Sequence, residues 1–319
     1  MALAFVFPGQ GSQSVGMLSE LAAAEPIVGT TFEEASDALG YDLWALIQDG
    51  PAEELARTER TQPAMLAAGV AVWRVWRQRG GPSPTVMSGH SLGEYTALVC
   101  ADSLDFSTAI KLVEFRGQMM QEAVPAGEGA MAAIIGLTDR QVASACEEGA
   151  HGGGVCEPVN FNAPNQIVIA GHAPAVDRAM QSARDKGAKR VVLLQVSVPS
   201  HSSLMRPAAE RMRERLEDTP FRHPLVPEIY TVDIGRHGYP DDIRAALVEQ
   251  LYKPVRWVDT IRSMVKEGVN AVVECGPGKV LMGLNRRIER RRELGVYGIY
   301  DPATVDEALA ACREVRANG

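Results

Sequence analysis

The chain has 319 residues, of which 46% are hydrophobic and 23% are charged, and its formal net charge is −8. This length can bury a large core in one big domain or in two unequal ones, and the composition is that of an ordinary globular protein. The negative charge argues against nonspecific nucleic-acid binding by the chain as a whole, although it does not exclude a local basic patch.

Targeting and redox features favour the cytoplasm. Residues 1–9 carry no basic side chain and only a short apolar run, unlike a signal peptide, and no run approaches the ~18 apolar residues of a membrane span. The five cysteines are scattered without paired or metal-like spacing, so we expect them to be reduced and mostly buried, with no metal site. We therefore expect a cytoplasmic protein that contacts no membrane.

The chain opens with a short apolar run, Leu3–Phe7, which ends at Pro8-Gly9 and is typical of a central parallel strand. The polar loop that follows begins at Gln10. Ligands of open α/β sheets gather at the carboxyl ends of strands, so Gln10 is either placed for chemistry or part of a plain surface turn.

Residues 18–80 have a helical pattern, and we expect breaks at Pro26, Gly40, Pro51 and Pro63. After this helical segment comes a possible nucleophile elbow. An apolar run at 85–87 precedes Gly-His-Ser91-Leu-Gly, and a helix-forming run at 94–101 follows it. A strand, a sharp turn with small flanking residues and a helix together expose a serine hydroxyl, so Ser91 is the candidate nucleophile. We expect its neighbour His90 to point to the opposite side of the elbow.

A helix is predicted from about Phe106 to Val124, with Asp105 or Ser107 as its N-cap. Arg116 lies on this helix among apolar residues. Such an arginine usually extends to water, and a buried position would need a carboxylate partner.

The segment 127–197 has a different pattern. It predicts strands at 130–137, 154–161, 166–170 and 190–196, with helices at 138–148 and 172–186. The order β-α-β-β-α-β is that of a ferredoxin-like unit, which we interpret as a small inserted domain.

The remainder resumes α/β alternation. We expect helices at about 202–217, 240–252, 257–267, 279–293 and from 304, and strands at 228–232, 270–275 and 295–300. The predicted fold class is α/β. A hydrolase-like catalytic domain with a parallel sheet is formed by 1–126 and 198–319, and the ferredoxin-like domain by 127–197.

A serine hydroxyl needs a positioned base, and six histidines are available. His201 is favoured because it follows a strand end where the chain re-enters the large domain, downstream of the serine as in α/β hydrolases. No aspartate stands out as a third member. The pattern therefore suggests a serine–histidine dyad oriented by another group, such as a backbone carbonyl. Oxyanion donors would be the backbone N–H of Leu92 and one from the Gln10 loop.

Several motifs occur together and in order along the chain. They are Phe-Pro-Gly-Gln-Gly-Ser-Gln13, Gly-His-Ser-Leu-Gly-Glu94, Arg116, Gly-Ala-Met-Ala-Ala133, Val-Asn-Phe-Asn162, Val-Pro-Ser-His201, Gln-Leu-Tyr-Lys-Pro-Val255 and Glu-Cys-Gly-Pro-Gly278. Over essentially its full length the chain resembles the malonyl-CoA:acyl-carrier-protein transacylases of bacterial type II fatty acid synthesis. The resemblance implies a hydrolase-like domain with a ferredoxin-like insert.

The resemblance also implies roles for individual residues. Ser91 would be the nucleophile and His201 the base, while Arg116 would pair with the malonyl carboxylate. Backbone N–H groups of Gln10 and Leu92 would form the oxyanion hole, and the main-chain carbonyl of Gln250 would orient the histidine.

The implied reaction is ping-pong transfer of a malonyl group from malonyl-CoA, through Ser91, to the phosphopantetheine thiol of holo acyl carrier protein. The two thiol compounds are substrates, so no cofactor is expected. We expect a monomer. Because carrier proteins are acidic, docking needs a positive patch, and the run 286–292 is the densest candidate, with Arg286 and Arg287 foremost.

Three alternatives remain open at this level. The same elbow and histidine would serve a serine thioesterase or esterase, which has no need of a buried arginine facing the serine. A second alternative is a trans-acting acyltransferase that feeds polyketide synthesis or loads a different extender, although by resemblance Leu92 and the Val-Pro-Ser-His201 run favour malonyl over bulkier branched units. The run 285–292 would be a nucleic-acid-binding helix in a non-enzymatic protein, although such a run is usually a solvated face.

Overall fold

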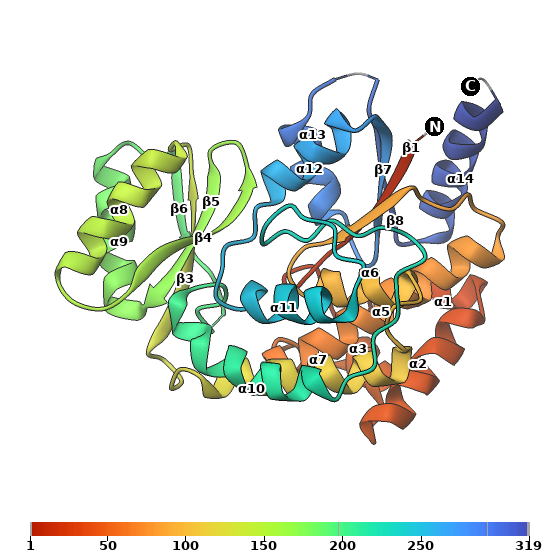
Figure 1. Cartoon of the computed structure of the whole chain (residues 1–319), viewed down its shortest axis with the longest axis horizontal. Helices are drawn as coiled ribbons and strands as arrows, with labels where there is room; N and C mark the ends of the chain where they lie inside the picture. The colour runs from red at the N-terminus through yellow and green to blue at the C-terminus, as the bar shows by residue number, and fades with distance from the viewer. Residues whose placement is uncertain (1, 197, 292, 318–319) are drawn as a thin grey trace.

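The computed structural model describes residues 2–196, 198–291 and 293–317. Two separate sheets organise the chain, each with four strands. In Figure 1 the smaller unit, coloured green, stands beside the larger one, which contains both the first and the last segments of the chain. The α/β class is confirmed, whereas the domain boundaries at 126/127 and 197/198 stay a prediction.

The larger sheet is parallel throughout, with the strand order β2-β1-β7-β8. Its strands are β1 (Ala2–Phe7), β2 (Val86–Gly89), β7 (Val269–Cys275) and β8 (Gly295–Ile299). Side chains of β1 alternate between two cores: Phe5 and Phe7 pack on one face, Ala4 and Val6 on the other. Burial on both faces explains why β1 is an unbroken apolar run, and its central position is confirmed.

Helices cover both faces of this sheet. The first part of the chain supplies α1 (Ser19–Ala24), α2 (Ile27–Leu39), α3 (Leu43–Asp49), α4 (Ala52–Leu55), α5 (Thr58–Gln78), α6 (Gly93–Cys100) and α7 (Phe106–Glu122). The last part supplies α10 (Arg206–Glu217), after the short 3-10 turn η1 (Ser203–Met205), and then α11 (Pro240–Gln250), α12 (Trp257–Lys266), α13 (Val280–Ile288) and α14 (Pro302–Ala317). Asp105 caps α7 with a bond from the Thr108 N–H, as expected.

The break expected at Pro63 is wrong. Pro63 lies inside the continuous helix α5, where it removes one backbone donor close to the N-terminus. Residues on both sides of it are buried, from Thr61 to Val72 without interruption, so packing stabilises the helix despite the lost hydrogen bond.

The smaller sheet contains β3 (Gly129–Ile135), β4 (Cys156–Ala163), β5 (Gln166–His172) and β6 (Arg190–Leu193) in the antiparallel order β4-β5-β3-β6. Helices α8 (Asp139–His151) and α9 (Ala173–Asp185) pack against it, and Thr138 begins α8 with a capping box. The predicted β-α-β-β-α-β order is confirmed. The last strand ends at Leu193, earlier than the predicted 196.

Two further expectations in the last part are corrected. The strand expected at 228–232 is reduced to isolated bridges, from Glu228 to Met87 and from Ile229 to Arg236, because the chain turns back at once, with Ile234 donating to the Tyr230 carbonyl. The helix expected to reach 293 ends at Ile288, since no side chain from Glu289 to 291 is buried to hold another turn.

Two general expectations can also be compared with the structure. All five cysteines are buried and free, as expected. None of the helices in the described part of the chain is both long and apolar enough to cross a membrane.

Close packing of α7 on α5 produces the first testable prediction. A Cβ added at Gly117 would lie 2.6 Å from the Cα of Glu59, whereas one at Gly29 on α2 meets nothing within 4 Å. Gly117→Ala should therefore destabilise the fold by ~1–3 kcal/mol, and Gly29→Ala should be neutral or stabilise it by up to ~1 kcal/mol. Urea unfolding of both variants measures this. Equal midpoints would show that the two helices are free to separate.

Candidate active site

Ser91 occupies the turn between β2 and α6 in the left-handed region, with φ 55°. Its flanking glycines are required by close approach. A Cβ on Gly89 would lie 1.8 Å from the carbonyl carbon of Gly93, and a Cβ on Gly93 would lie 2.0 Å from the carbonyl oxygen of Phe7. The strained turn therefore holds the hydroxyl at the carboxyl edge of the parallel sheet, at the N-terminal end of α6.

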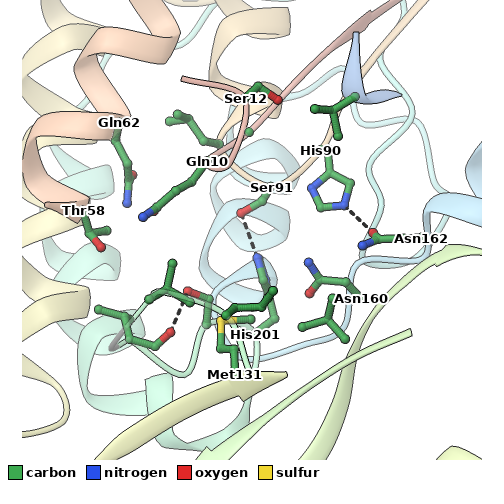
Figure 2. Close-up of a pocket in the computed structure, with 18 of the residues that line it drawn as sticks. Gln10, Ser12, Thr58, Gln62, His90, Ser91, Met131, Asn160, Asn162 and His201 are labelled. Carbon is green, nitrogen blue, oxygen red and sulfur yellow. Dashed lines mark hydrogen bonds between the residues drawn. The ribbon is translucent and has the colours of Figure 1, made fainter. Parts of the chain in front are cut away.

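His201 lies within hydrogen-bond reach of the serine. Its Nε2 is 2.8 Å from the Ser91 Oγ, and its Nδ1 is 2.7 Å from the backbone carbonyl oxygen of Gln250 (Figure 2 shows the first contact). Since a carbonyl only accepts, Nδ1 carries the proton and the Nε2 lone pair faces the serine hydroxyl. The backbone N–H of His201 donates to the carbonyl of Leu251, which fixes the residue from a second direction.

The histidine is buried and neutral. Burial, and secondarily the positive charge of Arg116, lower the pKa of His201 to about 3. At pH 7 the ring is therefore neutral, with its one proton on Nδ1, and Nε2 is free to accept a proton from the serine.

Arg116 projects from α7 into the same place and is only 1% exposed. Its Nη2 lies 3.3 Å from the Ser91 Oγ and donates to Oε1 of Gln250 at 2.8 Å, while Nη1 donates to Oε1 of Gln62 at 2.8 Å. The extension to water that is usual for such an arginine does not occur, and the expected carboxylate partner is replaced by two amide oxygens. Burial lowers the pKa of Arg116, but a guanidinium remains protonated in proteins.

Three side chains around Arg116 were not expected from the sequence: Gln62, the amide of Gln250, and Glu94. Gln62 lies directly before Pro63 within α5. Because a helix break was expected at Pro63, the sequence offered no reason to place Gln62 on this helix. Glu94 lies in the quoted elbow motif, which was the available signal. Glu94 is fully buried, and burial raises its pKa to about 7, although hydrogen bonds from Thr231 and Gln250 act to lower it.

Ser91, His201 and Arg116 lie in a cleft between the two units. The larger unit contributes the loop of Gln10, helices α5 and α7, and the start of α13; the smaller one contributes residues of β3, β4 and β5. Figure 2 shows Gln10 and Gln62 on one side of Ser91 and Asn160 on the other. Among the described residues, the backbone N–H groups of Gln10 and Leu92 have no acceptor.

The side chain of His90 lies along this cleft, which corrects the expectation that it points to the opposite side. Its Nε2 is 2.8 Å from Oδ1 of Asn162 on β4 (Figure 2). The left-handed turn at Ser91 changes the direction of successive side chains, so sequence neighbours do not alternate as they do in a strand. His90 thus connects the elbow to the smaller unit.

Arg286 and Arg287 lie in the last turn of α13 and are exposed. They do not line the cleft, whereas Val280, Leu281 and Leu284 of the same helix do. Arg286 donates to the Val296 carbonyl. In the basic run 286–292, helix α13 ends at Ile288, so Arg286 and Arg287 are its helical arginines; position 292 lies outside the described residues.

An elbow serine with a neutral histidine in contact is the arrangement of enzymes that carry an acyl group on serine. The acyl transferase domain family matches residues 4–297, so the chain is an acyltransferase. It is 59% identical to the malonyl CoA-acyl carrier protein transacylase of Escherichia coli K12 over 285 residues, which are 89% of this chain and 92% of that protein. With the enzyme of the same name from Bacillus subtilis it shares 42% identity over 99% of both chains.

Solved structures agree. The transacylase from Coxiella burnetii superposes with a TM-score of 0.95 at 51% identity, over 97% of each chain. A malonyl-transacylase in complex with a type II PKS acyl-carrier protein gives 0.95 at 52% identity, over 98% of this chain and 100% of that one. The chain belongs to the family of malonyl CoA-acyl carrier protein transacylases.

The depressed pKa of His201 makes a prediction about pH. In the folded protein the ring should stay neutral down to about pH 3, whereas an unfolded histidine protonates near its ordinary value of 6.5. Protons then favour the unfolded state, so the free energy of unfolding should fall as the pH drops below 6.5. NMR titration of the ring and urea unfolding at pH 7 and 5 measure both effects. His201→Gln should lose this part of the slope, and a ring titrating near 6.5 would refute the prediction.

Proposed function

We propose that this chain transfers the malonyl group of malonyl-CoA to the phosphopantetheine thiol of a holo acyl carrier protein, by a ping-pong reaction through malonyl-Ser91, and so supplies fatty acid elongation. The names of its relatives describe this reaction for those proteins. The thioester brings its own leaving group, so both thiol compounds act as substrates and the reaction needs no cofactor.

The observation that carries the proposal is the buried cation beside the nucleophile, Arg116 Nη2 at 3.3 Å from the Ser91 Oγ. A carboxylate on the acyl group is costly to remove from water unless a cation receives it. A thioesterase or esterase for neutral acyl groups has no use for such a buried charge. A trans-acting acyltransferase of polyketide synthesis remains the second candidate, because one similar structure is a complex with a type II PKS acyl-carrier protein.

In the first half-reaction, His201 Nε2 takes the hydroxyl proton as the Ser91 Oγ attacks the thioester carbonyl. The oxyanion is received by the backbone N–H groups of Gln10 and Leu92, while Arg116 holds the distal carboxylate. The C–S bond breaks, and the histidine returns its proton to the departing CoA thiolate. The Gln250 carbonyl stabilises the transient imidazolium, the role that an aspartate has in a triad.

In the second half-reaction, the phosphopantetheine thiol gives its proton to His201 and attacks the malonyl-serine ester. The serine oxygen leaves with that proton, and the malonyl thioester departs with its carrier protein. An acidic carrier requires a positive docking surface. Arg286 and Arg287 fit this role, because their helix α13 also lines the cleft at Val280. A monomeric and cytoplasmic enzyme remains our expectation.

The nucleophile assignment predicts the fate of two variants. Ser91→Ala should form no acyl-enzyme with malonyl-CoA, and His201→Ala should slow its formation by roughly three to four orders of magnitude, because the serine loses its base. Intact mass after brief incubation, before and after addition of holo carrier protein, measures both half-reactions. A malonyl adduct on Ser91→Ala would rule out this serine.

Arg116 should decide between malonyl and acetyl groups. Arg116→Ala leaves the substrate carboxylate desolvated and unpaired, a loss of ~2–5 kcal/mol, or roughly 30-fold to several-thousand-fold in kcat/KM for malonyl-CoA. Acetyl-CoA turnover should be unchanged or improved. Arg116→Lys should recover only part of the loss, since an ammonium does not reproduce bidentate binding. An unchanged malonyl-to-acetyl ratio in Arg116→Ala would mean that another group binds the carboxylate.

Docking should be separable from chemistry. Reversing the charge of Arg286 and Arg287 together to glutamate should slow transfer to holo carrier protein at least several-fold while sparing acylation by malonyl-CoA, because only the first needs the protein partner. The matched control reverses Arg211 and Arg213 on α10, which are also exposed. If the α13 pair slowed both half-reactions equally, or the α10 pair had the same effect, this docking surface would be wrong.

A further inference from the structure

Glu94 ends the elbow motif, yet the proposed chemistry gives it no part. Its carboxylate is fully buried behind the nucleophile. Oε1 accepts from both the backbone N–H and the hydroxyl of Thr231, at 2.8 and 2.7 Å, and Oε2 accepts from Nε2 of Gln250 at 2.5 Å. A carboxylate with this set of partners is a built feature of the interior, since burying the group is costly unless hydrogen bonds compensate.

The side-chain amide of Gln250 joins Glu94 to the site. Its Nε2 donates to Glu94 and also, at 2.8 Å, to the backbone carbonyl of Ser91. Its Oε1 accepts from Nη2 of Arg116 at 2.8 Å. The two ends of an amide have almost the same shape, so the partners decide which way it points. Here two acceptors face the nitrogen and a guanidinium faces the oxygen.

This relay explains how Arg116 lies buried without a carboxylate hydrogen-bonded to it. Its acceptors are the amide oxygens of Gln62 and Gln250 and the hydroxyl of Ser91. A direct ion pair would hold the guanidinium more tightly, because charged acceptors form stronger hydrogen bonds than neutral ones. An amide placed between the two charges keeps Arg116 oriented while a charged ligand can still compete for it.

We propose that Glu94 is a positioning residue: it holds the Gln250 amide with its oxygen toward Arg116, so that the guanidinium stays beside Ser91 and open to the acyl carboxylate. This inference rests on the proposed function, since its effect is on selection of a carboxylate-bearing acyl group. It separates two parts of Gln250. The backbone carbonyl holds His201 for the chemistry, and the side chain holds Arg116 for the choice of substrate.

Glu94→Gln keeps the shape of the side chain and tests this role. If the oxygen of the new side chain keeps its bonds from Thr231, its NH₂ faces Nε2 of Gln250. The Gln250 amide then either loses this partner or turns over and presents its own NH₂ to Arg116. The malonyl-to-acetyl ratio of kcat/KM for Ser91 acylation should fall by roughly 10- to 150-fold, the value of one hydrogen bond to a charged group. Acetyl acylation should fall much less, because this amide contacts Ser91 only at its backbone carbonyl and takes no part in the Ser91–His201 contact.

The control is Glu228→Gln. Glu228 is also buried, at 1% exposure, but among the described residues no hydrogen bond joins its carboxylate to Gln250 or Arg116. It should keep the wild-type ratio. A purely structural role for Glu94 would reduce the active fraction and so lower both substrates equally, which would overturn the proposal.

A second variant serves if Glu94→Gln does not fold. Gln250→Leu retains the backbone carbonyl that holds His201 and removes the amide, so it should lose the malonyl preference to a similar extent. Where both single variants fold, the double variant should be no worse than either alone. An unchanged ratio in Gln250→Leu would overturn the inference. If the wild-type enzyme itself showed no malonyl preference, both the proposed function and this inference would fail. If the wild type showed the preference and Glu94→Gln retained it, only the inference would fail.

Discussion

The hydrogen bond from Nδ1 of His201 to the carbonyl of Gln250 is the contact on which the site depends. It replaces the acid of a triad with a neutral backbone group, so the histidine is oriented without a carboxylate in contact with its ring. That carbonyl comes from the end of α11, and the histidine comes from the loop that leaves the smaller unit. The whole path of the chain from 129 to 250 therefore has to close correctly before the serine has a base.

Two sets of polar groups meet at Ser91 from different elements. In the proposed mechanism, backbone groups of Gln10, Leu92 and Gln250 receive charge that develops and disappears during the reaction. Side chains on α5 and α11 accept from the permanently charged Arg116, which extends from α7. Main-chain groups are fixed by the fold, whereas side chains can be exchanged by mutation. An enzyme built in this way can change its acyl group without rebuilding its catalytic apparatus.

Local signals in the sequence predicted most of the fold. The apolar run of β1, the cap at Asp105 and the glycines around Ser91 each act within a few residues. The failures involve distant contacts. Pro63 stays helical because of packing by other helices, and α13 ends where burial ends. Within the site, Ser91 and His201 were indicated by pattern, and Arg116 and Gln250 by resemblance. Gln62 and the Glu94 relay depend on how α5, α7 and α11 pack together, which one sequence does not reveal.

The burial of every cysteine has a consequence for a protein that handles thioesters. Thiolates exchange with thioesters, so an accessible one would divert acyl groups from the serine. Burial raises the pKa of the thiols at Cys100 and Cys275, and that of Cys312 to about 11, so these groups are both out of reach and protonated. Among the residues that the structure describes, no cysteine lines the cleft, so no thiol of the chain competes there with the serine or with the thiols of the substrates.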